Sequence, residues 1–157
     1  MTLRLFFTAD GALTEFAYWR YSISVEQIET AIIVIDGAET ILKAAEKLSA
    51  ALKKYQTVIC KAESFTGTDL LPAHAFFIGC ETPEPASFAY LYEMLQHINL
   101  SGRPCGVFST DKKALKYLSK MIEASGANAG EALLIDDPAT MPSAVKNWVK
   151  TIPASGF

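Results

Sequence analysis

The sequence lacks an excess of basic residues. Its 157 residues include 14 Lys and Arg against 17 Asp and Glu, which gives a formal net charge of −3. Domains that bind nucleic acid present a basic surface, so nucleic acid is not an expected partner. The sequence also lacks a run of about 18 apolar residues, which a membrane-spanning helix requires, so no membrane association is expected. The apolar part of its first eleven residues is too short for a secretory signal, and we expect a cytoplasmic protein.

Cysteine is scarce, and the three that are present, Cys60, Cys80 and Cys105, have no metal-like spacing. An odd number of cysteines within apolar runs is typical of buried, reduced thiols. Cys80 falls where a cleft is expected, but the neighbouring Glu81 and Glu84 would oppose the thiolate that a reactive cysteine needs. We therefore expect core thiols, with no disulfide and no metal site. Half of the residues are apolar, which predicts a globular chain with a real core.

A strand, a turn and a helix between residues 31 and 54 set the pattern of the chain. Ala31–Ile35 is apolar throughout, as a central parallel strand must be, and Asp36-Gly37 ends it. From residue 39 to 54 the apolar residues recur at helical spacing. Strands and helices then alternate, with further strands expected at 57–60, 75–79, 104–108 and 132–135, and helices at 86–98, from 112 to Gly126, and after Asp136-Asp137-Pro138. This alternation predicts an α/β domain over residues 31–157, with a doubly wound parallel sheet in the order 2-1-3-4-5.

The first 30 residues have a different pattern. LRLFFTA and ALTEFAYW flank Asp10-Gly11, a strong signal for the two-residue turn of a β-hairpin. In that pairing one face of the ribbon carries the apolar side chains of Leu3, Leu5, Phe7, Phe16 and Tyr18. A two-stranded ribbon is only marginally stable alone, so we expect residues 1–30 to be an N-terminal β-hairpin extension packed on the same domain or on a dimer partner. The following Ser24–Gln27 fits either a capping box or a polar linker.

Two later segments resemble a known family. Asp69–Gly79, which reads DLLPAHAFFIG, is similar to the flavodoxin segment that leads into the third strand. Asn99–Arg103 followed by Gly106–Phe108 is similar to that family's approach to the fourth strand. The resemblance covers about residues 31 to 152. It implies a flavodoxin-like three-layer sandwich with a five-stranded parallel sheet, and a site at which flavodoxins bind FMN with three loops.

The first of these loops departs from the family pattern. Flavodoxins have roughly Ser/Thr-x-Thr-Gly-x-Thr/Asn there, and this chain has Asp36-Gly37-Ala38-Glu39-Thr40-Ile41. Asp36 and Ala38 replace hydroxyls, Glu39 replaces the glycine, and Thr40 alone offers a hydroxyl. Each carboxylate would cost on the order of 1 to 5 kcal/mol beside a phosphate of charge about −2. Asp36 could instead cap the helix N–H groups and so fill the anion site with a side chain.

The second and third loops also depart from the family. The second, Gly79-Cys80-Glu81-Thr82-Pro83, has a thiol and a proline where flavodoxins have a hydroxyl and an aromatic residue. The third, Ser109-Thr110-Asp111-Lys112-Lys113, has neither glycine nor an aromatic residue. Phe88 or Tyr90 could stack on a flavin from the following helix, although Phe88 is more typical of a core position.

We therefore expect ordinary FMN binding to be lost, with no cofactor. The chain would then be a non-catalytic binding or regulatory module whose partner is an unidentified protein or a second copy. The alternative is an FMN-binding electron-transfer protein or reductase component with non-standard loops. Its cofactor-binding residues would be Asp36, Gly37, Ala38, Glu39, Thr40, Cys80, Glu81, Thr82, Ser109, Thr110 and Asp111.

Acidic side chains gather at the predicted strand ends. They are Asp36, Glu39, Glu81, Glu84, Asp111, Asp136 and Asp137. Three of them could cap helices, and the other interpretation is an acidic pocket for a cation or a basic partner. A phospho-receiver domain has the same strand order, but it needs an Asp after the third strand and a Lys after the fifth, where this chain has Cys80-Glu81 and Asp136-Asp137. For His74 and His97 we expect surface or capping roles.

Overall fold

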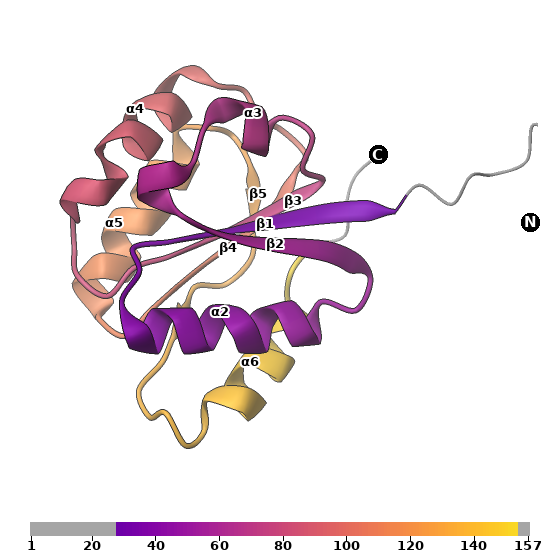
Figure 1. Ribbon diagram of the computed structural model, residues 1–157, viewed down its shortest axis with the longest axis vertical. Coiled ribbons are helices and arrows are strands. Elements are labelled where there is room, and N and C mark those ends of the chain that lie inside the picture. The colour runs from indigo at the N-terminus through magenta and orange to yellow at the C-terminus, as the bar shows by residue number, and fades with distance from the viewer. Residues whose placement is uncertain (1–27, 154–157) are drawn as a thin grey trace, which may run out of the picture.

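The structure, a computed structural model, describes residues 28–153 (Figure 1). The predicted hairpin extension lies almost wholly outside these residues, and so does Ser24–Gln27, so both remain predictions. The first described element is strand β1, Glu29–Ile35, which begins two residues before the predicted strand.

A parallel sheet runs through the middle of the domain. Its order is β2-β1-β3-β4-β5, with β6 also paired to β4, which confirms the predicted order 2-1-3-4-5. The remaining strands are β2 (Tyr55–Lys61), β3 (Ala75–Gly79), β4 (Pro104–Ser109), β5 (Asn128–Ala129) and β6 (Leu133–Leu134). Within residues 28–153 the sheet therefore has six strands, one more than predicted.

The predicted fifth strand at 132–135 is present as β6, which has only two residues, and a second short strand that was not predicted, β5, precedes it at Asn128–Ala129. β5 pairs with the start of β4 and β6 with its end. Between them, the carbonyl of Glu131 accepts a hydrogen bond from the indole N–H of Trp148 instead of pairing with β4. This side-chain contact interrupts the ladder where a continuous strand would have paired.

Helices cover both faces of the sheet, as the doubly wound prediction requires (Figure 1). Helices α2 (Glu39–Ala51) and α6 (Met141–Val149) lie on one face. The other face carries α4 (Ala89–His97) and α5 (Lys112–Glu123). Two short helices, η1 (Ala62–Ser64) and α3 (Gly67–Leu70), also pack on that second face, and η2 (Ala86–Phe88) leads into α4.

Helix α6 begins later than predicted, because Asp137 first closes a turn. The Ala139 N–H donates to Asp137 Oδ1 at 2.9 Å, and the Thr140 N–H donates to the Asp137 carbonyl at 3.2 Å. The helix then starts at Met141. No helix within residues 28–153 combines the length and the apolar character needed to cross a membrane.

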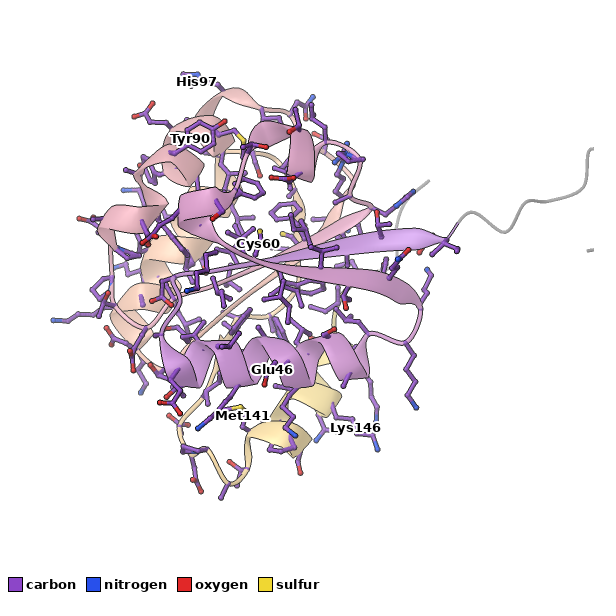
Figure 2. All side chains as sticks on the ribbon, in the orientation of Figure 1. Glu46, Cys60, Tyr90, His97, Met141 and Lys146 are labelled. Carbon is purple, nitrogen blue, oxygen red and sulfur yellow. The ribbon has the colours of Figure 1, made fainter. Side chains whose placement is uncertain are left out.

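Alternate residues of β1 face two separate cores. Ile32 and Val34 pack toward α4 and α5, whereas Ile33 and Ile35 pack toward α2 and α6. On the α6 side, the ring of Trp148 meets Phe77 and Phe108 edge-on, with ring centroids 5.9 and 6.1 Å apart. Figure 2 shows Met141 and Lys146 on α6, and Cys60 on the opposite side of the sheet. The all-apolar run that predicted a central strand is therefore buried on both faces.

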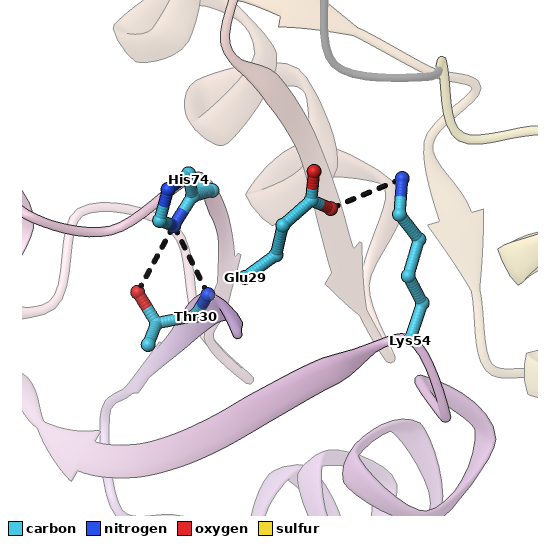
Figure 3. A network of polar contacts seen from close by, with 4 residues as sticks. All are labelled: Glu29, Thr30, Lys54 and His74. Atoms are coloured by element: carbon cyan, nitrogen blue, oxygen red, sulfur yellow. Dashed lines mark hydrogen bonds and ion pairs between the residues drawn. The ribbon is translucent and has the colours of Figure 1, made fainter. Parts of the chain in front are cut away.

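The amino end of the sheet is held by polar contacts (Figure 3). The Thr30 N–H donates to His74 Nδ1 at 3.1 Å, and the His74 N–H donates to the Thr30 carbonyl at 2.8 Å. Lys54 forms an ion pair of 3.0 Å with Glu29. His74 thus joins the start of β1 to the approach to β3, while His97 lies on the surface 3.8 Å from Glu93. His97 therefore has the expected surface position, whereas the bridging role of the partly buried His74 was not predicted.

Candidate functional site

The three predicted loops meet at the carboxyl edge of the sheet. Ile35 lies opposite Gly79, and Gly79 lies opposite Phe108. The first loop (36–41), the second loop (79–83) and the third loop (109–113) therefore leave neighbouring strands at the same level. Ligand sites of open parallel sheets lie at this edge. We call these three loops together the rim.

Asp36 joins the first loop to the second. Its Oδ1 accepts a hydrogen bond from the Ala38 N–H at 3.1 Å, and its Oδ2 accepts one from the Glu81 N–H at 2.8 Å. Gly37 has a φ of 91°, a turn conformation that brings the carboxylate back toward Ala38. The possibility that Asp36 caps the first turn of α2 is therefore wrong, because both oxygens serve amides outside that turn.

Ser109 joins the second loop to the third. Its buried hydroxyl donates to the Cys80 carbonyl at 2.6 Å and accepts from the Asp111 N–H at 3.0 Å. Asp111 in turn caps α5 by accepting a hydrogen bond from the Lys113 N–H at 3.2 Å. The N-cap of this helix is therefore Asp111 and not Thr110. The rim is thus fixed by contacts between loops as well as by the strands.

The amino end of α2 faces this rim with free donors. Its N-cap residue is Ala38, whose methyl group cannot accept a hydrogen bond, and the first intrahelical bond runs from the Leu42 N–H to the Ala38 carbonyl. The amides of residues 39–41 therefore have no intrahelical partner. Such donors and the helix dipole favour an anion.

Lys61 lies beside the rim, a position that the sequence did not predict. A Cβ placed on Gly37 would lie 3.9 Å from Lys61 Nζ, so the ammonium group sits over the first turn of the rim. Lys61 ends β2 opposite Ile35, the last residue of β1. The predicted second strand stopped one residue earlier, at Cys60. Extending it by that residue would have put a lysine beside Asp36.

The negative charge of Glu39 is partly offset by a lysine on the same helix. It forms an exposed ion pair of 2.9 Å with Lys43, one turn further on. The hydrogen bond and the charge of Lys43 lower the pKa of the Glu39 carboxyl. Together with Lys61, this cation moderates the negative charge that the sequence placed at the first loop.

Cys80 belongs to the second loop, and it is fully buried. Burial raises the pKa of its thiol to about 12, and the carboxylates of Asp36 and Asp111 act in the same direction. Cys60, on the far side of β1, also has a pKa raised by burial, to about 11, and neither thiol is in a disulfide. Nucleophilic or redox chemistry at Cys80 is therefore disfavoured, chiefly by burial and not by the predicted neighbours Glu81 and Glu84.

Neither predicted stacking residue reaches the rim. Phe88 is fully buried in the core, as its helical position suggested. Tyr90 is exposed on the surface of α4 (Figure 2), and its hydroxyl lies beside Gly67 in α3. The sequence did not single out Tyr92 and Tyr117, which stack with ring centroids 5.9 Å apart and planes 8° apart.

The stacked tyrosines line a hollow of about 500 Å³ that also includes Glu84 and Lys120. Burial raises the pKa of Tyr117 to about 12, with Cys80 and Glu84 acting in the same direction. The hollow is therefore next to the second loop. Aromatic surface is present near the rim, although it comes from α4 and α5 rather than from the loops.

The acidic residues do not form one cluster. Within residues 28–153, no group of three or more His, Cys, Asp or Glu side chains is arranged to hold a metal ion. Asp111 caps a helix, Asp36 spans two loops, and Asp137 closes the turn before α6. A basic partner surface remains compatible with this arrangement.

The fold has close structural counterparts among flavodoxins. The chain superposes on the Streptococcus pneumonia TIGR4 flavodoxin with a TM-score of 0.68 and 17% identity, covering 78% of this chain and 95% of that one. Oxidised Flavodoxin 2 from Bacillus cereus superposes with a TM-score of 0.67 and 17% identity, covering 78% of this chain and 96% of that one. Two-electron reduced Megasphaera elsdenii flavodoxin superposes with a TM-score of 0.60 and 17% identity, covering 77% of this chain and 99% of that one. No family model matches the sequence, and no curated protein does. The chain thus has the flavodoxin-like fold that the two sequence segments implied.

These counterparts correct one expectation. From the altered loops we expected no cofactor, yet all three structures are flavodoxins, the family that binds FMN at this edge of the sheet. Loop sequence alone is therefore an insufficient reason to exclude FMN. The comparison with the flavodoxin loops considered hydroxyl groups position by position, so it missed Lys61 and the main-chain N–H donors of α2.

Proposed function

We propose that this chain binds FMN at the rim and serves as an electron-transfer protein or as the flavin-carrying component of a reductase. One observation carries the proposal. An uncapped helix amino end, a glycine turn and the Lys61 ammonium meet at one point of a rim whose loops are fastened together. That combination suits the phosphate of a mononucleotide.

The phosphate end has a suitable set of donors. The N–H groups of residues 39–41 point away from the helix body, and the Thr40 hydroxyl is on the same turn. Lys61 adds a full positive charge from β2. The Asp36 carboxylate opposes the phosphate, but two amide hydrogen bonds already stabilise its charge. These donors support phosphate binding with a smaller penalty than two unpaired carboxylates would cause.

The part of the site that would contact the flavin ring has fewer suitable groups. The second and third loops offer main-chain groups of Cys80, Glu81 and Thr82, and of Thr110 and Asp111, but no aromatic side chain. A stacked aromatic pair contributes about 0.5 to 1.5 kcal/mol beyond the area that it buries. Binding should therefore be weaker than in a site with such stacking. The phosphate end would supply a larger share of the affinity.

When bound, FMN would supply reversible uptake and release of electrons. The chain's own contribution would be positioning and charge. Glu81 and Asp111 belong to loops on the ring side of the rim, and their carboxylates would disfavour additional negative charge there. The same acidic rim would favour a redox partner with a basic surface. We therefore propose a basic protein as the partner.

Titration with FMN and with riboflavin tests the proposal. We expect quenching of FMN fluorescence and weaker binding of riboflavin, which has no phosphate. Lys61→Met should weaken FMN binding about fivefold at low salt and leave riboflavin binding unchanged, because one exposed charge is lost. Lys53→Met, two residues beyond the far end of α2, is the matched control. If the folded protein binds no FMN at several hundred micromolar, the proposal fails, and a binding module without flavin chemistry is what remains.

A further inference from the structure

Strand β2 is an edge strand with one covered and one open face. Within residues 28–153 it pairs only with β1. Its α2-facing side chains, Tyr55, Thr57 and Ile59, are partly buried, and Ser49 of α2 hydrogen-bonds to Thr57. On the other face Val58 is 56% exposed, beside the exposed Gln56. An exposed apolar edge is a place where another strand can add.

The open face results from a short connection. Val58 lies opposite Ile32, so it faces the layer of α4 and α5. In that layer the chain passes from β2 to β3 through η1 and α3, which contain only 3 and 4 residues. Arg103 holds this segment inward by donating to the carbonyls of Leu70 and Ala73, each at 3.0 Å. The segment covers Ile32 and leaves Val58 exposed.

We infer that the N-terminal segment of this same chain covers that edge. Residues 3–19 have the alternation of a hairpin, with Leu3, Leu5, Phe7, Phe16 and Tyr18 on one face. An apolar ribbon face needs a surface to pack on, and in the described part of the chain the outer edge of β2 has no strand partner and lies beside an exposed valine. In this arrangement residues 13–19 pair with the outer edge of β2, and the apolar ribbon face extends over Val58.

The point at which the chain enters the domain fits this arrangement. Ile28, 68% exposed, precedes Glu29, and Glu29 lies opposite Tyr55 at the start of β2. A strand that lies beside β2 and leads to Glu29 must run toward the amino end of β2. It is therefore antiparallel to β2. It lies two strand spacings, about 9.6 Å, from β1. The nine residues 20–28 can span up to about 30 Å, so the connection is long enough.

Amide hydrogen exchange of the full chain, measured residue by residue by NMR, tests the inference. Every second amide of β2 donates a hydrogen bond to β1, and the intervening amides point away from β1, toward the open edge of the sheet. If residues 13–19 pair there, we expect these outward amides to exchange at least about tenfold more slowly than unstructured ones. Phe16→Asp, on the apolar ribbon face, should abolish that protection while β3 and β4 stay protected. Ala17→Asp, on the opposite face, is the matched control and should preserve it.

Three results would overturn the inference. Outward amides of β2 that exchange freely in the unmodified chain would show that nothing covers the edge. Equal effects of Phe16→Asp and Ala17→Asp would show that the apolar ribbon face is not the contact. Protection that disappears on dilution, together with a fall from dimer to monomer mass in light scattering, would assign the cover to a second copy.

Discussion

The carboxylate of Asp36 and the amide of Glu81, which are 45 residues apart in the sequence, are joined by a hydrogen bond of 2.8 Å. The other oxygen of Asp36 holds the Ala38 amide. One side chain therefore sets the relative position of two loops. It also places a negative charge beside the donors of α2, so its structural and electrostatic effects can be separated by mutation.

Asp36→Asn should tighten FMN binding about fivefold to tenfold. The amide keeps an oxygen that can accept one of the two hydrogen bonds, while the repulsion between a carboxylate and a phosphate at about 6 Å is removed. The measurement is a fluorescence titration at low salt, with folding checked by circular dichroism. Glu46→Gln removes an exposed charge on the same helix away from the rim and should have no effect. Unchanged affinity in a folded Asp36→Asn variant would argue against phosphate at this position.

The protein should lose stability as the pH rises above about 9. Burial raises the pKa of Cys80 and of Cys105 to about 12, against 9.0 for an ordinary thiol. Between pH 9 and 12 the native state keeps these protons and the unfolded state releases them. The free energy of unfolding therefore falls with increasing pH in this window and is unaffected by these thiols below it.

Cys105→Ala isolates one contribution to this loss. Its stability at pH 7 should be lower than that of the parent chain, because a buried sulfur is removed. Above pH 9 its stability should fall less steeply, by up to about 1.4 kcal/mol per pH unit, because one proton fewer is released. Urea unfolding with reductant between pH 7 and 10.5 gives both values. Parallel pH curves for the two proteins would contradict the assignment.

Gly106→Ala should destabilise the fold by about 1 to 3 kcal/mol through overpacking. A Cβ at Gly106 would lie 2.6 Å from Cζ2 of Trp148, whose ring is fixed between Phe77 and Phe108. Gly67→Ala is the contrast, since its nearest contact is the Met94 sulfur at 3.3 Å, at the end of a flexible side chain. Urea denaturation should show a clear loss for the first variant and a small change for the second. Equal losses would mean that Trp148 yields as readily as Met94.

Arg103→Met should destabilise the protein by about 2 kcal/mol, because two carbonyls lose a charged donor. The loss should be local as well, with faster amide exchange in α3 and at Ala73. Lys116→Met, an exposed change on α5, provides the baseline. A global loss without faster exchange in α3 would show that Arg103 does not hold this segment.

The sequence predicts most of the fold because periodicity reports burial directly. The apolar run at residues 31–35 is buried on both faces, and the strand at 75–79 has the predicted bounds. It misses β5 and the break between β5 and β6, where a contact between Glu131 and Trp148, 17 residues apart, decides the geometry. No local pattern encodes such a contact.

The rim was predictable in place but not in its interactions. The strand ends located Asp36, Cys80 and Ser109 at one edge, as observed. The partners of Asp36 and Ser109 come from other loops, and Lys61 reaches Gly37 only through the pairing of β2 with β1. These relations follow from strand register, which single-residue comparison with a loop pattern does not consider.

The two margins of the sheet differ in a way that limits self-association. At one margin, β5 and β6 contain 2 residues each and are separated by a turn toward Trp148. At the other, β2 offers 7 continuous residues. Within residues 28–153, only the β2 margin can therefore template a long strand. With residues 13–19 paired to β2, as we infer, β2 becomes an interior strand and a second copy cannot add to it.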